Sequence, residues 1–293
     1  VPAGTSNPEN PLQLAPLAGN IALRAWFREE DIDISTNTWV AAPSNDDWFD
    51  PLNWSLMVPP LPGQTVIIPT GQALRLTNAT PSLGRFELAD GATLTFDGWE
   101  SALQADELVI AGTVTHAAHT VTDPDPVTGE WVPQHRILLQ VSNLTVTTTG
   151  SLNADYKGYP PGAGPGAPTL GGGYDGCGGG GYGGNGSSGF GGAPPGPAYG
   201  DPADPWQPGS GAKQYRTSLN GAGGGAIRIE MTGRITLHGT VTAQGQPGGG
   251  IYQPGGSGGG IALYCDTFQG SSSGLVRADG GRGNLYGGCG GGG

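Results

Sequence analysis

Four histidines are the side chains in this sequence best suited to acid–base catalysis or metal binding: His116, His119, His135 and His238. His116 and His119 would need a helix to bring their rings together, but the surrounding residues alternate as at the end of a strand. No CxxC or CxxH pair is present either, which disfavours a zinc site. Nothing in the sequence indicates a Ser-His-Asp or Cys-His arrangement, so we expect neither catalytic residues nor a resident metal.

The positions of the acidic residues favour a role in turns over a role in catalysis or metal binding. Asp123 and Asp125 alternate with prolines in a loop that could hold calcium, although this composition is also ordinary in turns. Calcium is therefore the only cofactor that the sequence leaves open. Asp155 and Asp279 recur at the same point of an internal repeat, in which Gln244 occupies the third copy. This recurrence favours carboxylates that cap a turn over carboxylates that catalyse a reaction.

The internal repeats define the elements that carry these residues. Three segments share the pattern Gly-x-Leu/Val-x-Ala: 150–158, 239–248 and 274–283. A second repeat places a glycine run directly before an alternating segment, in "GAGGGAIRIEM" (221–231) and "GGSGGGIALYC" (255–265). Short period-two runs broken by glycine predict short strands, and their repetition predicts an all-β parallel β-helix, a solenoid of stacked rungs. An antiparallel β-sandwich is the alternative for the same strands.

The first part of the chain differs from these repeats. Residues 1–46 are expected to form an extended N-terminal segment, and residues 47–62, which are aromatic and irregular, to cap the solenoid. A solenoid end needs such a cap because it exposes apolar core and unpaired strands. Exposed tryptophans would instead suit a sugar-stacking platform. The β-helix itself is expected over residues 63–293.

The glycine-rich tract 171–192 lies within an expected insertion over residues 159–225. Five glycines of the tract are spaced by three: Gly180, Gly183, Gly186, Gly189 and Gly192. Polyproline-II helices have about three residues per turn, so this spacing lines one edge with glycine and lets backbones approach. The interleaved aromatic residues favour an ordered tract, and a flexible glycine loop is the alternative.

The net charge limits the binding partners that are expected, and the cysteines indicate one candidate disulfide. The net charge is −12 and only two residues are lysines, so binding to nucleic acid or to an anionic membrane is not expected. Among three cysteines, Cys177 and Cys289 have matching glycine-rich surroundings and are candidates for a disulfide. Alternation directs Cys265 toward the core as a small apolar residue.

Several stretches together resemble glycine-rich bacterial cell-surface proteins of the right-handed parallel β-helix type. They are "FDPLNWSLMVPPLPGQTVIIPTGQALRL", "LADGATLTF", "ELVIAGTVT" and the glycine-rich "GGGYDGCGGGGYGG" and "AGGGAIRIEM". The likeness covers residues 47–293. It implies secretion to the cell surface or the extracellular space, and a role as an adhesin, a surface layer or an extracellular filament.

We therefore expect a structural protein that assembles by strand contacts between subunits. The final "GGCGGGG" precedes the point where the repeat calls for another strand, so an open edge is expected there. Residues 20–34 are the candidate to cover that edge in a neighbouring subunit, as a head-to-tail homopolymer, or within their own chain. Their candidate contact residues are Ile21, Ala22, Leu23, Trp26, Phe27, Ile32 and Ile34. The alternatives are a glycan-binding adhesin and a carbohydrate-active β-helix, a lyase or a hydrolase.

Overall fold

The computed structural model describes residues 33–169, 177–213 and 221–293 of the chain. Residues 34–293 form one compact unit, which begins upstream of the segment boundary expected at residue 46. Apart from the short 3-10 helices η1 (Pro51–Asn53) and η2 (Phe190–Gly192), its regular elements are strands. Every ladder between these strands is parallel, which excludes the antiparallel sandwich.

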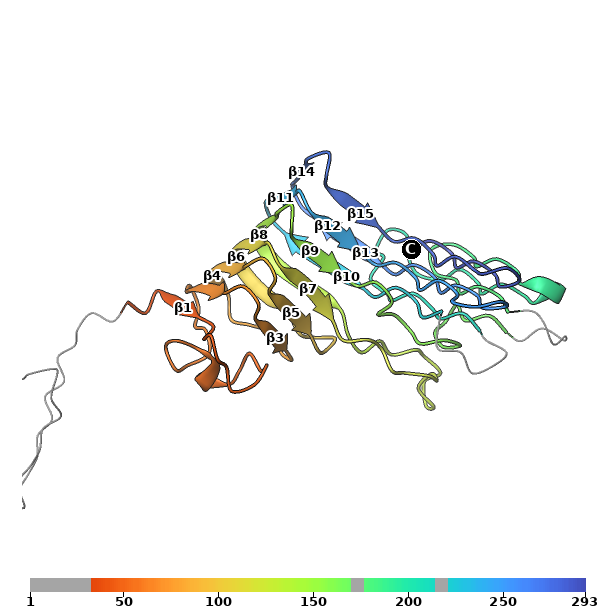
Figure 1. Cartoon of the computed structure of the whole chain (residues 1–293), viewed down its shortest axis with the longest axis horizontal. Coiled ribbons are helices and arrows are strands. Elements are labelled where there is room, and N and C mark those ends of the chain that lie inside the picture. Colours follow the sequence, from red (N-terminus) through yellow and green to blue (C-terminus); the bar gives the residue numbers. More distant parts are fainter. Residues whose placement is uncertain (1–32, 170–176, 214–220) are drawn as a thin grey trace, which may run out of the picture. The chain divides into compact units, whose positions relative to one another are not determined.

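The strands form two parallel sheets (Figure 1). The large sheet has the order β1 (Thr36–Thr38), β2 (Thr65–Ile68), β4 (Leu83–Leu88), β6 (Leu103–Ile110), β8 (Ile137–Val146), β10 (Ile227–Met231) and β13 (Ile261–Tyr264). Within it, β11 (Arg234–Leu237) pairs with β8 and β14 (Thr267–Gly270). The small sheet has the order β3 (Ala73–Leu76), β5 (Thr93–Phe96), β7 (Thr113–His116), β9 (Ser151–Asn153), β12 (Thr240–Thr242) and β15 (Leu275–Arg277).

Residue alternation explains the core between these sheets. In β2 the side chains of Val66 and Ile68 are buried while Thr65 and Ile67 are partly exposed, as expected for a strand with one face on the core. Leu74 and Leu76 of β3 do the same for the small sheet. The chain passes from a strand of the large sheet to one of the small sheet and then starts the next rung. Each rung thus stacks its apolar side chains on the rung before.

The pairing register confirms the repeat that the sequence indicates. Thr240 of β12 pairs with Ser151 of β9 and with Leu275 of β15, so the preceding glycines, 239, 150 and 274, occupy equivalent corners. A Cβ atom at Gly239 would lie 2.1 Å from the carbonyl oxygen of Gly150. Only glycine lets the stacked backbones approach this closely at the corner.

Glycine-rich segments continue beyond the strands as a bundle of extended chains, which we call the glycine bundle (Figure 1). It comprises residues 158–169, 177–213, 221–226, 243–260 and 278–293. Backbone hydrogen bonds connect segments far apart in sequence: Gly180 donates to Gly255 (3.1 Å), and Gly291 donates to Gly180 (2.9 Å). A Cβ atom at Gly180 would lie 2.4 Å from the carbonyl oxygen of Ser210. The described part of the tract 171–192 is therefore packed backbone and not a slack linker.

Candidate functional site

The two ends of the sheets differ in how their edges are covered. At the first end, β1 pairs with the outer edge of β2, and Asp47 forms a parallel bridge with Arg75 of β3. Three buried tryptophans pack there: Trp39 and Trp48 lie 5.0 and 4.9 Å from Trp54, measured between ring centroids. Because these rings are buried, they cannot serve as the sugar-stacking platform considered from the sequence.

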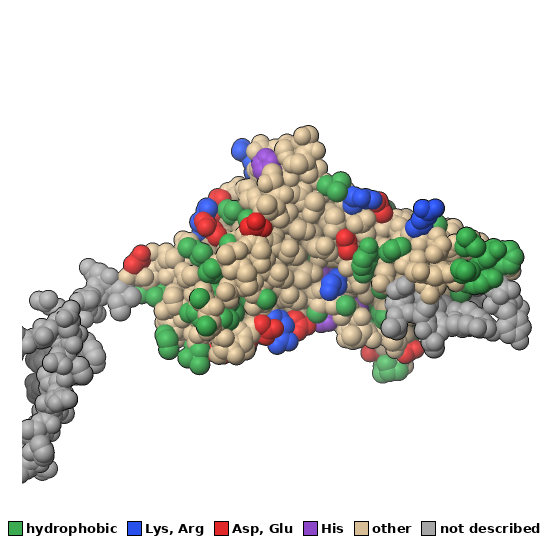
Figure 2. Space-filling view, in the orientation of Figure 1, with side chains coloured by type: hydrophobic (Ala, Val, Ile, Leu, Met, Phe, Trp, Pro, Cys, Tyr) green, Lys and Arg blue, Asp and Glu red, His purple; other side chains and the backbone are tan. Residues whose placement is uncertain are grey.

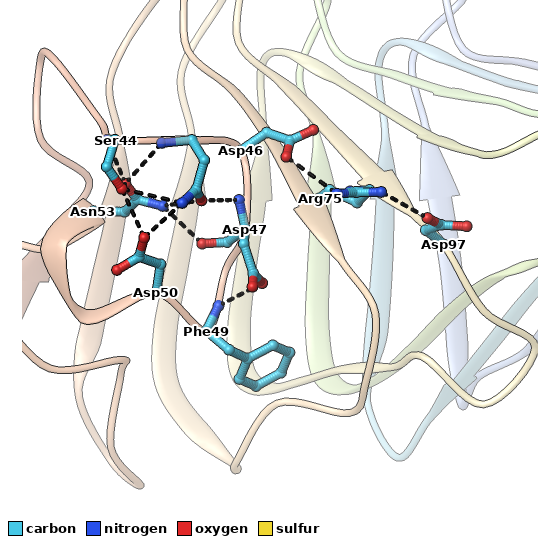
Figure 3. Close-up of polar contacts among 9 residues, drawn as sticks. Ser44, Asp46, Asp47, Phe49, Asp50, Asn53, Arg75 and Asp97 are labelled. Carbon is cyan, nitrogen blue, oxygen red and sulfur yellow. Dashed lines mark hydrogen bonds and ion pairs between the residues drawn. The ribbon is translucent and has the colours of Figure 1, made fainter.

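A polar network holds the loop that carries these tryptophans (Figure 3). The side chain of Asn53 donates to Asn45 Oδ1 (3.0 Å) and to the Asp47 carbonyl (2.8 Å), and it accepts from the Ser44 amide (2.8 Å). Hydrogen bonds from Ser44, from the Leu52 amide and from Asn45 lower the pKa of Asp50. The carboxylates here are occupied in fixing the loop, which is a structural task.

At the other end, the outer side of the last strands has no strand partner among the described residues. We call β13, β14 and β15 the end rung. Within the described ranges, β13 pairs only with β10, β14 only with β11, and β15 only with β12. Each strand therefore presents unpaired backbone groups on its outer side, which is the geometry that recruits a further strand.

Side chains of the end rung that should be interior are exposed. Val276 of β15 is 42% exposed, whereas Val241, its partner in β12, is 3% exposed. A pocket of about 570 Å³ lies beside this edge and is lined by Ile261, Val276, Ala278 and Gly293 together with Tyr182 and Tyr199 of the glycine bundle. The end rung therefore combines an unpaired edge with an apolar surface, and it is the candidate functional site.

Of the residues expected to contact this edge, only Ile34 lies in the described part of the chain, where its side chain is 63% exposed. The others lie outside the described residues: Ile21, Ala22, Leu23, Trp26, Phe27 and Ile32. Their role in assembly stays a prediction.

The cysteines expected to form a disulfide lie on neighbouring segments of the glycine bundle. Cys177 forms a parallel bridge with Gly287, and the Cys177 carbonyl accepts from the Gly288 amide (2.9 Å). In this register Cys289 lies beside Gly179, so bridging the two sulfurs requires a shift along the segments. The disulfide stays a prediction. Cys265 is partly buried and packs against the core.

Three histidines gather in the structure: His116 and His119 come together at a strand end without a helix, contrary to the expectation above, and no sequence pattern indicated that His135 joins them. The ring centroids of His119 lie 5.9 Å from His116 and 5.6 Å from His135. His116 Nδ1 donates to the Ala117 carbonyl (2.8 Å) and its Nε2 accepts from the Ala226 amide (3.2 Å), so the ring is neutral and fully bonded. Burial lowers the pKa of His116 to about 3.

The ring of His119 is held by one hydrogen bond. Its Nδ1 accepts from the Gln134 amide (2.9 Å), and its buried Nε2 has no hydrogen-bond partner among the described residues. Burial, with repulsion from His116 and His135, lowers the pKa of His119 to about 3. His135 Nδ1 lies 3.3 Å from Asp97 Oδ1. In the described ranges no group of three or more His, Cys, Asp or Glu side chains has the arrangement of a metal site.

In the loop considered for calcium, the side chain of Asp125 stabilises a turn. Asp125 Oδ1 accepts from the amides of Val127 (2.8 Å) and Thr128 (2.9 Å), and these hydrogen bonds lower its pKa. Likewise, Asp155 accepts from the amide (2.7 Å) and the side chain (3.1 Å) of Gln244, which caps the corner between two rungs. Calcium binding at Asp123 and Asp125 stays a prediction.

Sequence reasoning missed a group of charged and aromatic residues beside the large sheet. Arg228 bonds both Asp204 and Glu230 (2.6 Å each), and the Tyr264 hydroxyl donates to Asp204 (2.8 Å). The Tyr264 hydrogen bond and Arg228 lower the pKa of Asp204, while Gln140 and Arg228 lower that of Glu230. Both carboxylates are thus ionised and paired. Glu230 pairs in register with Tyr264 on one side and with Gln140 on the other. Aligning these strands in the sequence would have indicated a row of polar side chains across the rungs.

Comparisons of the chain with protein-family models, with curated proteins and with solved structures find no match. None of the helical segments in the described ranges has the length and apolar character of a membrane span.

Proposed function

We propose that this chain is a structural protein, a parallel β-helix that associates with further copies of itself through its end rung. The observation that carries the proposal is the contrast between the two ends of the sheets. The first edges, β2 and β3, are covered by the chain itself, whereas the outer sides of β13, β14 and β15 have no strand partner among the described residues. Natural proteins seldom leave several adjacent edges unprotected unless something pairs with them.

Residues 20–34 of a second copy are the proposed occupant of this edge. Their Ile21-Ala22-Leu23 repeats the letters of Ile261-Ala262-Leu263 in β13. A strand of this composition suits the position that follows β13, because β10 and β13 already stack Ile227 on Ile261. The neighbouring Trp26 and Phe27 supply apolar area for the exposed side chains of the end rung.

The positions of donor and acceptor favour open-ended growth. Ile34 directly precedes β1 at the first edge of the large sheet, and β13 is the last strand of the same sheet. A contact between unlike surfaces at opposite ends of one sheet is heterologous, and it continues from copy to copy unless rotation closes a ring. The product of such growth is a filament, a sheath or an adhesive surface. The resemblance to bacterial cell-surface proteins supports an extracellular location and the right-handed coil.

Deletion of residues 1–32 tests the donated strand, because it leaves the compact unit from Ile34 intact. We expect the full chain to form larger species with rising concentration in light scattering, and the deleted chain to stay monomeric with the same circular dichroism spectrum and melting temperature. Assembly that persists after the deletion overturns the donated strand. A full chain that is monomeric at all concentrations overturns the proposed function.

A carbohydrate-active enzyme is the second candidate, favoured by Arg228, Asp204, Glu230 and Tyr264 beside a surface hollow of about 440 Å³. A hydrolase needs one protonated carboxyl group to act as the acid, whereas both carboxylates here are paired with arginine. Incubation with neutral and acidic polysaccharides, followed by a reducing-end assay and by absorbance of unsaturated products, tests this candidate. Activity that is lost in Glu230→Gln would support it.

A further inference from the structure

Three turns of the glycine bundle carry exposed apolar side chains. We call these side chains the aromatic tip: Phe190, Ile251, Tyr252, Leu285 and Tyr286. They are between 36% and 73% exposed. In Figure 1, η2 lies at the end of the bundle away from the strands, and Figure 2 shows hydrophobic side chains gathered at that end. Exposed apolar groups that cluster in this way mark interaction sites more often than scattered ones do.

The rings of the tip contact one another across turns that are distant in sequence. Tyr286 stacks on Tyr252 with a centroid distance of 4.8 Å and an angle of 21° between the planes. Phe190 lies 4.8 Å from Tyr286 on a tilted plane, and the Phe190 amide donates to the Tyr286 carbonyl (2.9 Å). The three rings thus form one preorganised surface.

Two side chains of the tip occupy backbone positions that normally require glycine. The Gln253 amide donates to the Gly250 carbonyl (3.0 Å), which closes a turn whose third residue, Tyr252, has φ +68°. In the turn closed between Asn284 and Gly287 (2.8 Å), the second residue, Leu285, has φ +38°. Bulky residues are strained in this region, and in a chain with 58 glycines these turns still keep large side chains. Strained positions of this kind cluster at functional sites, and here two of them coincide with the exposed ring stack.

The tip is uncharged in an acidic protein. Residues 185–196 and 248–254 contain no Asp, Glu, Lys or Arg, and residues 282–290 contain only Arg282, while the net charge of the chain is −12. Tyrosine hydroxyls and the side chain of Asn284 supply the polar groups. This surface therefore suits a ligand that combines flat apolar faces with hydroxyl groups and needs no charged partner.

We propose that the aromatic tip binds neutral β-linked glycans. The apolar C–H face of a pyranose ring with equatorial substituents stacks on an aromatic ring, and its hydroxyls bond to phenol and amide groups at the edge. The backbone beneath is fixed by hydrogen bonds, such as that from Gly287 to Asn284, so little order is lost on binding. This proposal is independent of assembly at the end rung, which uses other residues.

The test is a calorimetric titration of the full chain with cellohexaose and with chitohexaose. We expect saturable binding of at least one of them, and an affinity at least about tenfold weaker in Tyr252→Gly and, from another turn, in Phe190→Ala. Tyr252→Gly relieves the positive φ, so its melting temperature should stay within about 4 °C of the unmodified chain. Tyr156→Gly is the matched control, because Tyr156 is also exposed and has φ +62° but lies outside the tip. It should bind as the unmodified chain does.

Three outcomes overturn the proposal. The first is no heat of binding with either oligosaccharide, and the second is equal affinity in Tyr252→Gly and the unmodified chain. The third is binding of the unmodified chain to phosphatidylcholine vesicles in sedimentation assays, with loss of this binding in Tyr252→Gly and no glycan binding by either chain. This result would show that the tip binds a lipid surface. If the second outcome is accompanied by a large fall in the melting temperature of Tyr252→Gly, the ring stack has a purely structural role.

Discussion

Phe268 of β14 pairs in register with Ile235 of β11, yet Phe268 is 51% exposed and Ile235 is 2% exposed. The two side chains occupy equivalent positions in successive rungs, so the difference arises from the absence of a further described rung on β14. Interior positions of the end rung are therefore apolar without being buried.

This difference in burial predicts that substitution by aspartate affects self-association at Phe268 and stability at Ile235. Phe268→Asp should change the free energy of unfolding by less than about 0.5 kcal/mol and should reduce self-association, because the new charge is solvated and lies on the proposed contact surface. Ile235→Asp buries a charge and should destabilise the chain by about 3 kcal/mol or more. Urea unfolding and light scattering measure both. Unchanged association of Phe268→Asp would count against the end rung as the contact.

The free energy of unfolding should decrease as the pH is lowered, because the buried histidines of the cluster resist protonation in the folded chain. Burial lowers the pKa of His116 and of His119 to about 3 in the folded chain, whereas unfolded histidine titrates near 6.5. Between these values the unfolded state binds more protons, so stability is complete above about pH 6.5 and is lost as the pH falls. Each histidine contributes up to about 1.4 kcal/mol per pH unit.

Urea unfolding at pH 7.5 and pH 5.5 checks this slope. His119→Gln retains an acceptor for the Gln134 amide and should reduce the pH dependence by about half, since one of two buried groups is removed. His238→Gln, outside the cluster, is the control and should keep the full slope. Equal slopes in all three chains would show that the cluster does not govern acid stability.

Gly225 should tolerate no side chain while His116 is present. A Cβ atom at Gly225 would lie 2.0 Å from His116 Nε2. Gly225→Ala should therefore destabilise the chain by about 1–3 kcal/mol, because the ring must move and lose its bond from the Ala226 amide. In the next rungs the position of His116 is held by alanine, at 154, 243 and 278, so His116→Ala should relieve the clash.

A double-mutant cycle of Gly225→Ala and His116→Ala measures this coupling by thermal unfolding. We expect the double variant to lose less stability than the sum of the single variants, by about 1 kcal/mol. Gly292→Ala is the control, since a Cβ atom there meets nothing within 4 Å. Additive losses would refute a direct clash.

The glycine tract should behave as packed backbone. A Cβ atom at Gly180 would lie 2.4 Å from the Ser210 carbonyl oxygen, whereas at Gly184 its nearest neighbour is the Gly292 nitrogen at 3.8 Å. Gly180→Ala should lower the melting temperature by several degrees, corresponding to about 1–3 kcal/mol, and Gly184→Ala should leave it nearly unchanged. In hydrogen exchange, the bonded amides of Gly180 and Gly291 should be protected. Random-coil exchange rates throughout the tract would contradict this packing.

The sequence by itself determined the parallel strands and the equivalence of their corners. Glycines 150, 239 and 274 and the following alanines align in the sequence and in the pairing register, because a two-residue alternation and a steric need for glycine are local properties. The same register continues His116 into Ala154 of the next rung and then into Ala243, which agrees with the sequence alignment of His116 with Ala243.

Only the tertiary structure decided which glycine segments pair, and how far the glycine bundle extends. The sequence indicated an insertion over residues 159–225, but segments after β12 and β15 join it through contacts such as Gly180 with Gly255 and Gly291. Glycine has no side chain to record its partner, so backbone hydrogen bonding across long separations selects the pairs. The aromatic tip and the Arg228 group are also assembled from distant turns and rungs, so the tip left no local pattern, and the Arg228 group left only the repeat that aligns Glu230 with Tyr264.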